Sequence, residues 1–413
     1  MHRRTFSSTR CQVILCLFCF LAVIGTASAG DIFTHQAASL TYSIGNNTDI
    51  FTIEEARDRG LIIGGHATDI LEDQHAFLMK TDPDGNTIWI QAYPGRWVAA
   101  VAECDDGNIF SASLSEIPML GREPMDGSGY LAMTDQKGSV VWQEEIRDKL
   151  PGALQVTDHE IVLVGWAYDS DDPAKAAYGY FSRYDYSGNL LDTVAYPDAP
   201  VYSVYPADDG GFLLVGSMDI QESADGDHAG YLSKVDRHGK LEWTSIIPGR
   251  PLYAITETAD GYLMVGGTEP YGSSTGQAWA VFVSADATLI HEEPLPGYAA
   301  YAVAPFGNEF LIAGGTGPYN PFIATLSPEG TLTSSKRFLD DDGRFLAATP
   351  LADGRVAVGG WSRQTGSAEG WLLILDPVTK PTPTPKEAAG FGFISAIITL
   401  GAGAAIVWQR ARR

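Results

Sequence analysis

Arginines and aromatic residues recur at one type of position in this chain, shortly after a Pro-Gly pair or at the matching place in a later repeat. They are Arg96 and Trp97, Arg250 and Tyr253, Tyr298 and Tyr301, and Arg344 and Phe345. Planar guanidinium groups bind carboxylates, and aromatic rings serve as anchors in binding sites. If the fold gathers these residues, they form a site for a carboxylate, a sugar or a peptide. The alternative is that they cap strands and pair with nearby acids.

A second group of candidates is acidic, and carboxylates gathered on one rim are suitable ligands for Ca²⁺. The group contains Asp69, Glu72, Asp73, Asp169, Asp171, Asp172, Asp219, Glu222, Asp225 and Asp227. Asp82-Pro83-Asp84-Gly85-Asn86 partly matches a calcium loop, but it lacks the later glutamate and occupies a position where each repeat needs a turn. We expect an ordinary turn there. Calcium is the one cofactor that the sequence suggests.

Catalytic signatures are missing from the sequence. It contains no HExxH, GxSxG, CxxC or Walker motif, and its 8 histidines lack metal-ligand spacing. The sequence therefore predicts a binding or structural protein without catalytic or metal-ligating residues. The alternative is an extracytoplasmic enzyme, either a quinoprotein-type dehydrogenase or a carbohydrate-active protein.

The elements that position these residues repeat along the chain. Apolar runs that close on glycine are GLIIGG (60–65), EIVLVG (160–165), GFLLVG (211–216), GYLMVG (261–266), EFLIAG (309–314) and GRVAVG (354–359), and NIFSAS (108–113) fills the remaining slot with Ser113. Successive runs close 45 to 52 residues apart. Each is followed by a strand, a tight turn and another strand, with Gly85, Gly138, Gly188, Gly239 or Gly330 at the turn. Four short strands per repeat are typical of a propeller blade.

Two further features organise each repeat. Trp89, Trp142 and Trp243 share one position on the outer strand, where large rings can pack between neighbouring sheets. Pro-Gly begins a new unit at Pro94-Gly95, Pro151-Gly152, Pro248-Gly249 and Pro296-Gly297, with Pro197-Asp198 as a variant. The seventh unit lacks its outer strand, and the segment 37–45 resembles one. We therefore expect an all-β, seven-bladed β-propeller over residues 30–379, closed by its N-terminal strand.

These units resemble the Gly-rich repeats of surface proteins in methanogens and bacteria. They are also distantly similar in style to quinoprotein and WD-type propellers. The resemblance implies the fold only, because one fold serves many functions.

Both ends of the chain have the character of targeting segments. Residues 1–29 match a signal peptide, with basic residues, an apolar core and a small-residue site before Gly30. Residues 380–386 form a Pro/Thr stalk, and residues 387–413 combine an apolar stretch with terminal arginines. An apolar helix with arginines on its cytoplasmic side predicts a transmembrane segment that holds the propeller outside the cell.

This C-terminal arrangement resembles the sorting signals of archaeal surface proteins, in which an archaeosortase recognises a Pro-Gly-Phe motif. Gly390 and Phe391 match the motif, while Ala389 stands in place of its proline. The resemblance implies an archaeal cell-surface protein anchored in the cytoplasmic membrane by the helix or by a lipid. It leaves open whether the helix is cleaved.

Charge and modification signals agree with an exported protein. The net charge of −24 disfavours nucleic-acid binding, since an acidic surface repels phosphates. Asn46-Asn47-Thr48 is an N-glycosylation sequon, and Cys104 is the only cysteine downstream of the N-terminal apolar run. The partners that we expect are the membrane and a cell-envelope protein or glycan.

Overall fold

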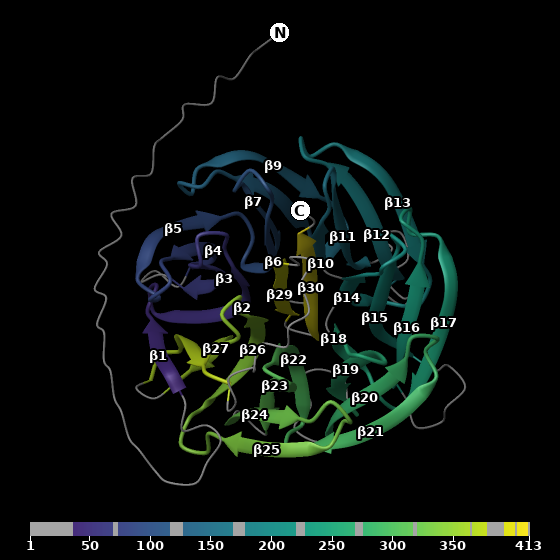
Figure 1. The fold of residues 1–413 in the computed structure, drawn as a ribbon. Helices are drawn as coiled ribbons and strands as arrows, with labels where there is room; N and C mark the ends of the chain where they lie inside the picture. The colour runs from purple at the N-terminus through teal and green to yellow at the C-terminus, as the bar shows by residue number, and fades with distance from the viewer. Residues whose placement is uncertain are drawn as a thin grey trace.

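The computed structural model describes residues 36–68, 73–115, 127–167, 178–219, 228–268, 276–316, 320–363, 366–377, 392–400 and 403–411. Every regular element in these ranges is a β-strand, and the strands form a ring of radial sheets around a central axis (Figure 1). The expected all-β propeller is confirmed. Within these ranges no helix is long and apolar enough to cross a bilayer.

Consecutive strands are grouped in antiparallel sets of four. Within each set the first strand lies nearest the axis and the fourth lies at the rim. The first two sets are β2 (Asn47–Glu55), β3 (Leu61–Thr68), β4 (Gln74–Thr81) and β5 (Thr87–Tyr93), then β6 (Trp97–Glu103), β7 (Ile109–Leu114), β8 (Gly129–Thr134) and β9 (Val140–Ile146). The third and fourth are β10 (Lys149–Val156), β11 (Glu160–Ala167), β12 (Tyr178–Asp185) and β13 (Leu190–Tyr196), then β14 (Val201–Pro206), β15 (Phe212–Asp219), β16 (His228–Val235) and β17 (Leu241–Pro248).

The remaining sets continue around the ring. They are β18 (Leu252–Glu257), β19 (Gly261–Gly267), β20 (Ala278–Ser284) and β21 (Leu289–Leu295), then β22 (Ala299–Phe306), β23 (Glu309–Thr316), β24 (Asn320–Leu326) and β25 (Leu332–Arg337). The last set joins β26 (Gly343–Pro350), β27 (Val356–Ser362) and β28 (Glu369–Leu375) to β1 (Gln36–Tyr42) from the other end of the chain.

The number of hydrogen-bonded sheets differs from the seven separate sheets expected. The described strands form six sheets, because β19 and β22 are linked by the pair Gly267–Ala299 and two sets become one sheet of eight strands. A glycine allows this approach, since a Cβ on Gly267 would lie 2.9 Å from the carbonyl oxygen of Tyr298.

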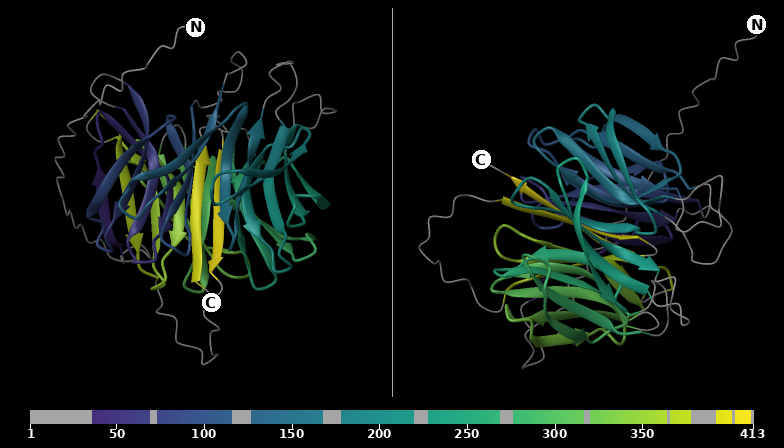
Figure 2. Two further views of the ribbon diagram at one scale, coloured as in Figure 1. Left: turned by 90° about the horizontal axis from the view of Figure 1, so that it is seen from above. Right: turned by 90° about the vertical axis from the view of Figure 1, so that its right-hand side faces the viewer.

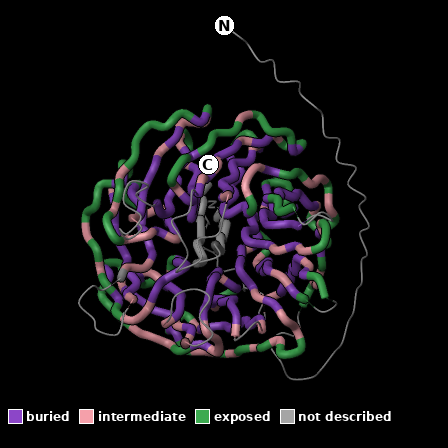
Figure 3. Tube along the Cα trace, turned by 180° about the vertical axis from the view of Figure 1, so that it is seen from behind, coloured by how far each residue is buried: buried purple, intermediate pink, exposed green. Residues whose placement is uncertain are grey.

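Burial follows the position of a strand within its set. Second strands such as β3 are buried throughout, as their continuous apolar runs predict, whereas outer strands such as β13 are largely exposed. Figure 3 shows the same gradient, with buried residues toward the axis and exposed ones at the rim. The core therefore lies between neighbouring sheets.

Two outer-strand tryptophans, Trp89 and Trp142, pack against the turn of the following set. Trp89 Nε1 donates to the carbonyl oxygen of Gln136 at 3.1 Å, and Trp142 Nε1 donates to that of Tyr186 at 2.9 Å. Each ring covers the turn of the following set, and a Cβ on Gly138 would lie 2.9 Å from the indole of Trp89. Gly138 also has a φ of 84°, so both the conformation and the packing require glycine. The predicted packing of tryptophans between sheets is confirmed for these two residues.

The ring closes through the N-terminal strand, as expected. β1 pairs antiparallel with β28, and the Trp371 indole donates to Ser39 Oγ at 3.0 Å. The Tyr42 hydroxyl donates to the carbonyl oxygen of Gly85 at 2.8 Å, so β1 also contacts the first set. Removing an unpaired sheet edge in this way limits association through strand pairing.

The two ends of the closed ring lie side by side. Gln36, where β1 begins, is the register partner of Leu375, where β28 ends. Because β28 is a third strand, this point lies on the face that carries the turns between first and second strands, which we call the turn face. The opposite face carries the connections from one set to the next, and we call it the crossover face. Figure 2 shows the ring edge-on.

The C-terminal segment, for which the sequence predicts a transmembrane helix over residues 387–413, contains two described strands. β29 (Gly392–Leu400) and β30 (Gly403–Ala411) form an antiparallel hairpin near the axis, and β30 meets β14 at the pair Val204–Val407. The membrane location stays a prediction. The signal peptide (1–29), the stalk (380–386), Gly390 and Phe391 lie outside the described residues.

Candidate functional site

Each first strand contains one β-bulge near the crossover face. The residues left out of register at these bulges are Phe51, Ala99, Gly152, Tyr202, Tyr253, Tyr301 and Leu346. Close approach of the first strand near the bulge explains the glycine at the end of two of the apolar runs, since a Cβ on Gly65 would lie 2.0 Å from the Asp49 carbonyl oxygen and one on Gly216 would lie 2.0 Å from that of Pro200. In the second set Ser113 takes this place, opposite Val98. Bulges re-aim side chains and are frequent beside binding sites.

Three consecutive sets carry tyrosine at the bulge, and the three rings are in contact. The ring centroids of Tyr202 and Tyr253 are 5.9 Å apart, and those of Tyr253 and Tyr301 are 5.8 Å apart with the planes at 30°. Trp166 of β11 extends the series, with its ring 5.7 Å from Tyr202 in an edge-on arrangement. These distances suit favourable aromatic pairs. We call these four residues the aromatic row.

Exposure differs along the aromatic row. Tyr202 is half-buried, and its hydroxyl lies 2.9 Å from Ser217 Oγ, whereas Trp166, Tyr253 and Tyr301 are buried. At the far end of the row, a Cβ on Gly315 would lie 3.4 Å from Arg344 Cγ and 3.8 Å from Tyr301 Cε2. The aliphatic part of a half-buried arginine therefore approaches the end of the row.

Arg250 is directed to its own set rather than to the aromatic row. Its guanidinium lies 4.2 Å from the Trp279 ring centroid, and Nη2 lies 3.0 Å from Glu292 Oε2. Lys149 occupies the same position, three residues before its bulge, and its Nζ lies 5.0 Å from the Tyr180 ring centroid. A cation above a third-strand ring is thus a repeated packing feature.

Arg96 and Trp97 lie in the second set. Arg96 is exposed and its backbone N–H donates to the Leu114 carbonyl oxygen at 2.6 Å. Trp97 is buried, with its ring centroid 5.5 Å from that of His66, whose Nδ1 lies 3.4 Å from Asp49 Oδ2. This group is not in contact with the aromatic row through any described ring pair.

Phe345 and Tyr298 complete the expected residues. Phe345 is fully buried, with ring centroids 5.4 Å from Phe338 and 4.9 Å from Trp371, so it belongs to the core between sheets. Tyr298 is half-buried, and its backbone N–H donates to the Gly315 carbonyl oxygen at 3.0 Å. Of the expected residues, the structure brings Tyr253, Tyr301 and Arg344 together.

The prediction of a Pro-Gly turn at Pro151-Gly152 is wrong. Pro151 and Gly152 lie inside β10, and Gly152 is its bulge residue. The turn that precedes β10 contains Asp148, with a φ of 58°. Aspartate tolerates the left-handed region by local hydrogen bonding, so it replaces the expected glycine.

Sequence reasoning missed Trp166 and Tyr202. The signal for Tyr202 was present, because Tyr202 follows Asp198 by four residues, as Tyr253 follows Gly249. Asp198 has a φ of 55°, so it is the turn residue of that crossover. Trp166 carries no comparable signal, since its role depends on the strand beside it.

The acidic candidates lie mostly outside the described residues. Asp73 and Asp219 are described, and no described group of three His, Cys, Asp or Glu side chains is arranged to hold a metal ion. Asp82 forms an ordinary turn, as expected: its Oδ1 accepts from the backbone N–H groups of Asp84 at 3.0 Å and Asn86 at 2.8 Å. The Asn86 side-chain amide, which donates to Asp82 Oδ2 at 2.9 Å, and those backbone bonds hold the pKa of Asp82 below its usual value.

Comparisons with known proteins are informative about the fold alone. No protein-family model and no curated protein matches the chain. The WD40 β-propeller domain of Doa1 is 10% identical, with a TM-score of 0.52, over 82% of this chain and 96% of that one. The Dos1 propeller is 12% identical, with a TM-score of 0.51, over 84% of this chain and 97% of that one. The chain is similar to these propellers in architecture.

Proposed function

We propose that this chain is a seven-bladed propeller that acts as a non-enzymatic binding module, with its partner at the crossover face. The observation that carries the proposal is the aromatic row, in which Trp166, Tyr202, Tyr253 and Tyr301 come from four consecutive sets and meet. Aromatic residues dominate the energy of many interfaces, and an arginine beside them adds a hydrogen-bonding anchor.

The position of the chain ends supports an orientation at the cell surface. The described ring begins and ends at Gln36 and Leu375, which are register partners on the turn face. A C-terminal membrane segment or lipid attached beyond a stalk would therefore hold the turn face toward the membrane. The crossover face would then point away from the cell, toward a cell-envelope protein or glycan. The sequon at exposed Asn46 fits the same exported location.

A binding comparison of two tyrosine variants tests this proposal. The full-length chain is reconstituted in nanodiscs and applied to a glycan array and a displayed peptide library. Tyr202→Ala alters the half-buried member of the aromatic row. Tyr262→Ala is the matched control, because Tyr262 is also half-buried and lies edge-on to a tyrosine, Tyr205, at a centroid distance of 6.2 Å outside the row.

We expect Tyr202→Ala to weaken binding of the selected ligands by about tenfold or more, which corresponds to about 1.4 kcal/mol. Tyr262→Ala should change it by less than about twofold. Equal losses in both variants would refute the placement of the site. Redox turnover with an added quinone, or release of sugar from an array glycan, would refute the non-enzymatic proposal.

A further inference from the structure

A fully buried carboxyl group lies at the joint between the first and second sets, on the turn face. Glu54 of β2 is 0% exposed, and Glu103, the last residue of β6, is 7% exposed. Glu54 Oε1 accepts from the backbone N–H of Glu103 at 3.0 Å, whereas Glu54 Oε2 has no hydrogen-bond partner among the described residues. A carboxylate is costly in this setting, because a buried charge needs partners for its oxygens.

Glu103 joins the two sets in the opposite direction. Its Oε2 accepts from the backbone N–H of Arg57, in the turn between β2 and β3, at 2.7 Å. Each glutamate therefore accepts from the set of the other one. Burial raises the pKa of both carboxyl groups, and the negative charge of Glu103 adds to the rise at Glu54.

The positive charges near this pair are shared with other acids. The charge of Lys80, on β4, favours ionisation of both glutamates, but its Nζ lies 2.5 Å from Asp58 Oδ1. Arg57 acts on both glutamates as well, and its guanidinium is paired with Asp105. These cations therefore offset the burial of the two carboxyl groups only in part.

The other elements around the pair carry groups that are neutral or face another joint. Glu55 Oε2 accepts from the Ala352 N–H of the last set at 2.8 Å, and Asp353 and Arg355 pair with each other at 2.8 Å. The thiol of Cys104 stays neutral, since burial raises its pKa to about 12. β29, which lies beside β2, contains no ionisable residue.

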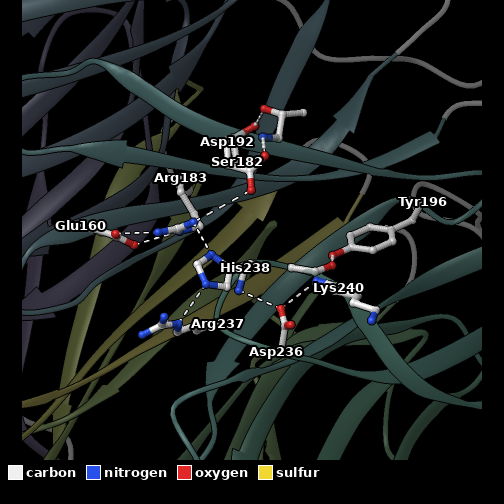
Figure 4. Close-up of polar contacts among 11 residues, drawn as sticks. Glu160, Ser182, Arg183, Asp192, Tyr196, Asp236, Arg237, His238 and Lys240 are labelled. Atoms are coloured by element: carbon white, nitrogen blue, oxygen red, sulfur yellow. Dashed lines mark hydrogen bonds and ion pairs between the residues drawn. The ribbon is translucent and has the colours of Figure 1, made fainter.

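A carboxylate at a later joint is stabilised in the usual way (Figure 4). Arg183 Nε and Nη2 donate to the two oxygens of Glu160 at 2.8 and 2.6 Å. Arg183 Nη1 lies 2.6 Å from His238 Nδ1 of the fourth set. Because a cation pairs with both oxygens, the pKa of Glu160 is held below its usual value. The one donor to Glu54 is a neutral backbone N–H, so its pKa moves the opposite way.

A neutral side chain can take the place of Glu54. Glu54 lies three residues after the bulge residue Phe51, and Gln155 lies three residues after the bulge residue Gly152 of the third set. Gln155 is also buried, at 2% exposure, and its Nε2 donates to the Val156 carbonyl oxygen at 3.0 Å. The fold therefore accepts an uncharged group of this shape at the joint.

We propose that Glu54 and Glu103 share one proton and act as a pH-sensitive lock between the first and second sets. With the proton in place, the pair carries a single negative charge and the joint is closed. Loss of the proton puts a second charge on a buried oxygen without a donor, and the two sets separate to hydrate it. The folded chain holds this proton more tightly than the unfolded chain does. The lock is therefore complete at low pH and is lost as pH rises through the titration of the pair.

Hydrogen exchange of the full-length chain tests this lock. Protection factors, which correct for the effect of pH on the intrinsic rate, are measured in steps from pH 5 to pH 8. Peptides from β6 report on the joint, and peptides from β18 serve as the reference first strand. The opening equilibrium at β6 should rise at least about tenfold between pH 5 and pH 8, and that at β18 should change by less than about twofold.

Two variants test whether Glu54 is the group that titrates. Glu54→Gln should reduce the rise at β6 to less than about twofold, because the amide cannot ionise. Glu257→Gln is the matched control, since Glu257 occupies the position of Glu103 in the fifth set, is exposed and accepts from the Tyr205 hydroxyl at 2.8 Å. It should leave the tenfold rise at β6 unchanged.

Glu103→Gln distinguishes a shared proton from a loss of packing. It removes the charge that opposes ionisation of Glu54, so the midpoint of the rise at β6 should move to lower pH. A loss of packing alone would lower protection equally at every pH and leave the midpoint in place, which would overturn the proposal. Equal protection of β6 at pH 5 and pH 8, an undiminished rise in Glu54→Gln, or a rise of the same size at β18 would also overturn it.

Discussion

The hydroxyl of Tyr42 provides a test of how the ring is held closed. Tyr42 of β1 is buried, and its hydroxyl donates to the carbonyl oxygen of Gly85 at 2.8 Å. Tyr42→Phe removes the donor and leaves that carbonyl without this partner. Losing one partner of a buried hydrogen bond costs about 1–3 kcal/mol. For this neutral bond of ordinary length we expect about 1.5 kcal/mol, which raises the population of states opened at β1 about tenfold.

Native-state hydrogen exchange measures that opening directly. Tyr196→Phe is the matched control, because the Tyr196 hydroxyl donates to the Gly239 carbonyl oxygen at 2.5 Å across a joint inside the ring. Both variants should lose global stability in urea. Only Tyr42→Phe should accelerate exchange of the β28 amides, by about tenfold, since β1 is joined to β28 by strand pairing and not by a short loop.

The two variants give a clear criterion for rejecting this reasoning. If β28 amides exchange at the wild-type rate in Tyr42→Phe, or equally fast in Tyr196→Phe, the hydroxyl does not hold the closure. The joint between β1 and the first set would then be stabilised by other contacts, such as the side chain of Leu40 in β1, which lies against Gly85.

Further substitutions test the joints elsewhere. Burial raises the pKa of Glu54 well above its ordinary value of 4.5. The folded chain therefore keeps a proton that the unfolded chain loses as pH rises above that value, and the free energy of unfolding should fall with rising pH. Glu54→Gln should reduce this fall in urea denaturation at pH 5 and pH 8; an unchanged slope would contradict the assignment. In thermal unfolding, Gly138→Ala should lower the free energy of unfolding more than Gly354→Ala does, by about 1 kcal/mol or more. Both glycines have positive φ, but only Gly138 lies against a ring. Equal losses in the two variants would exclude the ring contact. Trp142→Phe should lower the free energy of unfolding by about 1 kcal/mol in the same assay, because the indole hydrogen bond to the Tyr186 carbonyl oxygen is lost. An unchanged stability would contradict a role for this bond.

Much of the architecture was predictable because its signals are local. An apolar run that ends in glycine, and a tight turn between two strands, each reflect the conformation of a few residues. Repetition of these signals at nearly constant spacing predicted the propeller and its closure by residues 37–45. The single misplaced turn, at Pro151-Gly152, arose because a glycine in a bulge and a glycine in a turn look alike in sequence.

The candidate site was only partly predictable, because its contacts join residues that are distant in the sequence. Tyr253 and Tyr301 were recognised from their distance to a turn, yet nothing local indicated that Trp166 would meet Tyr202 or that Arg250 would turn toward Trp279. Likewise, no motif links Arg183 to His238, which lie 55 residues apart. The first and third of these contacts join different sheets, and Arg250 reaches Trp279 across the strand that lies between them in its own set.

The sequence by itself thus determined the strand pattern, the turn residues and the large rings at the joints, since these depend on backbone conformation and on apolar periodicity within each repeat. Tertiary structure alone decided which side chains face one another. Neighbouring sheets are twisted and each first strand contains a bulge, so the direction of a side chain depends on the sheet beside it. That neighbouring sheet is formed by residues about 50 positions further along the chain or, for β1, by residues from the opposite end of the chain.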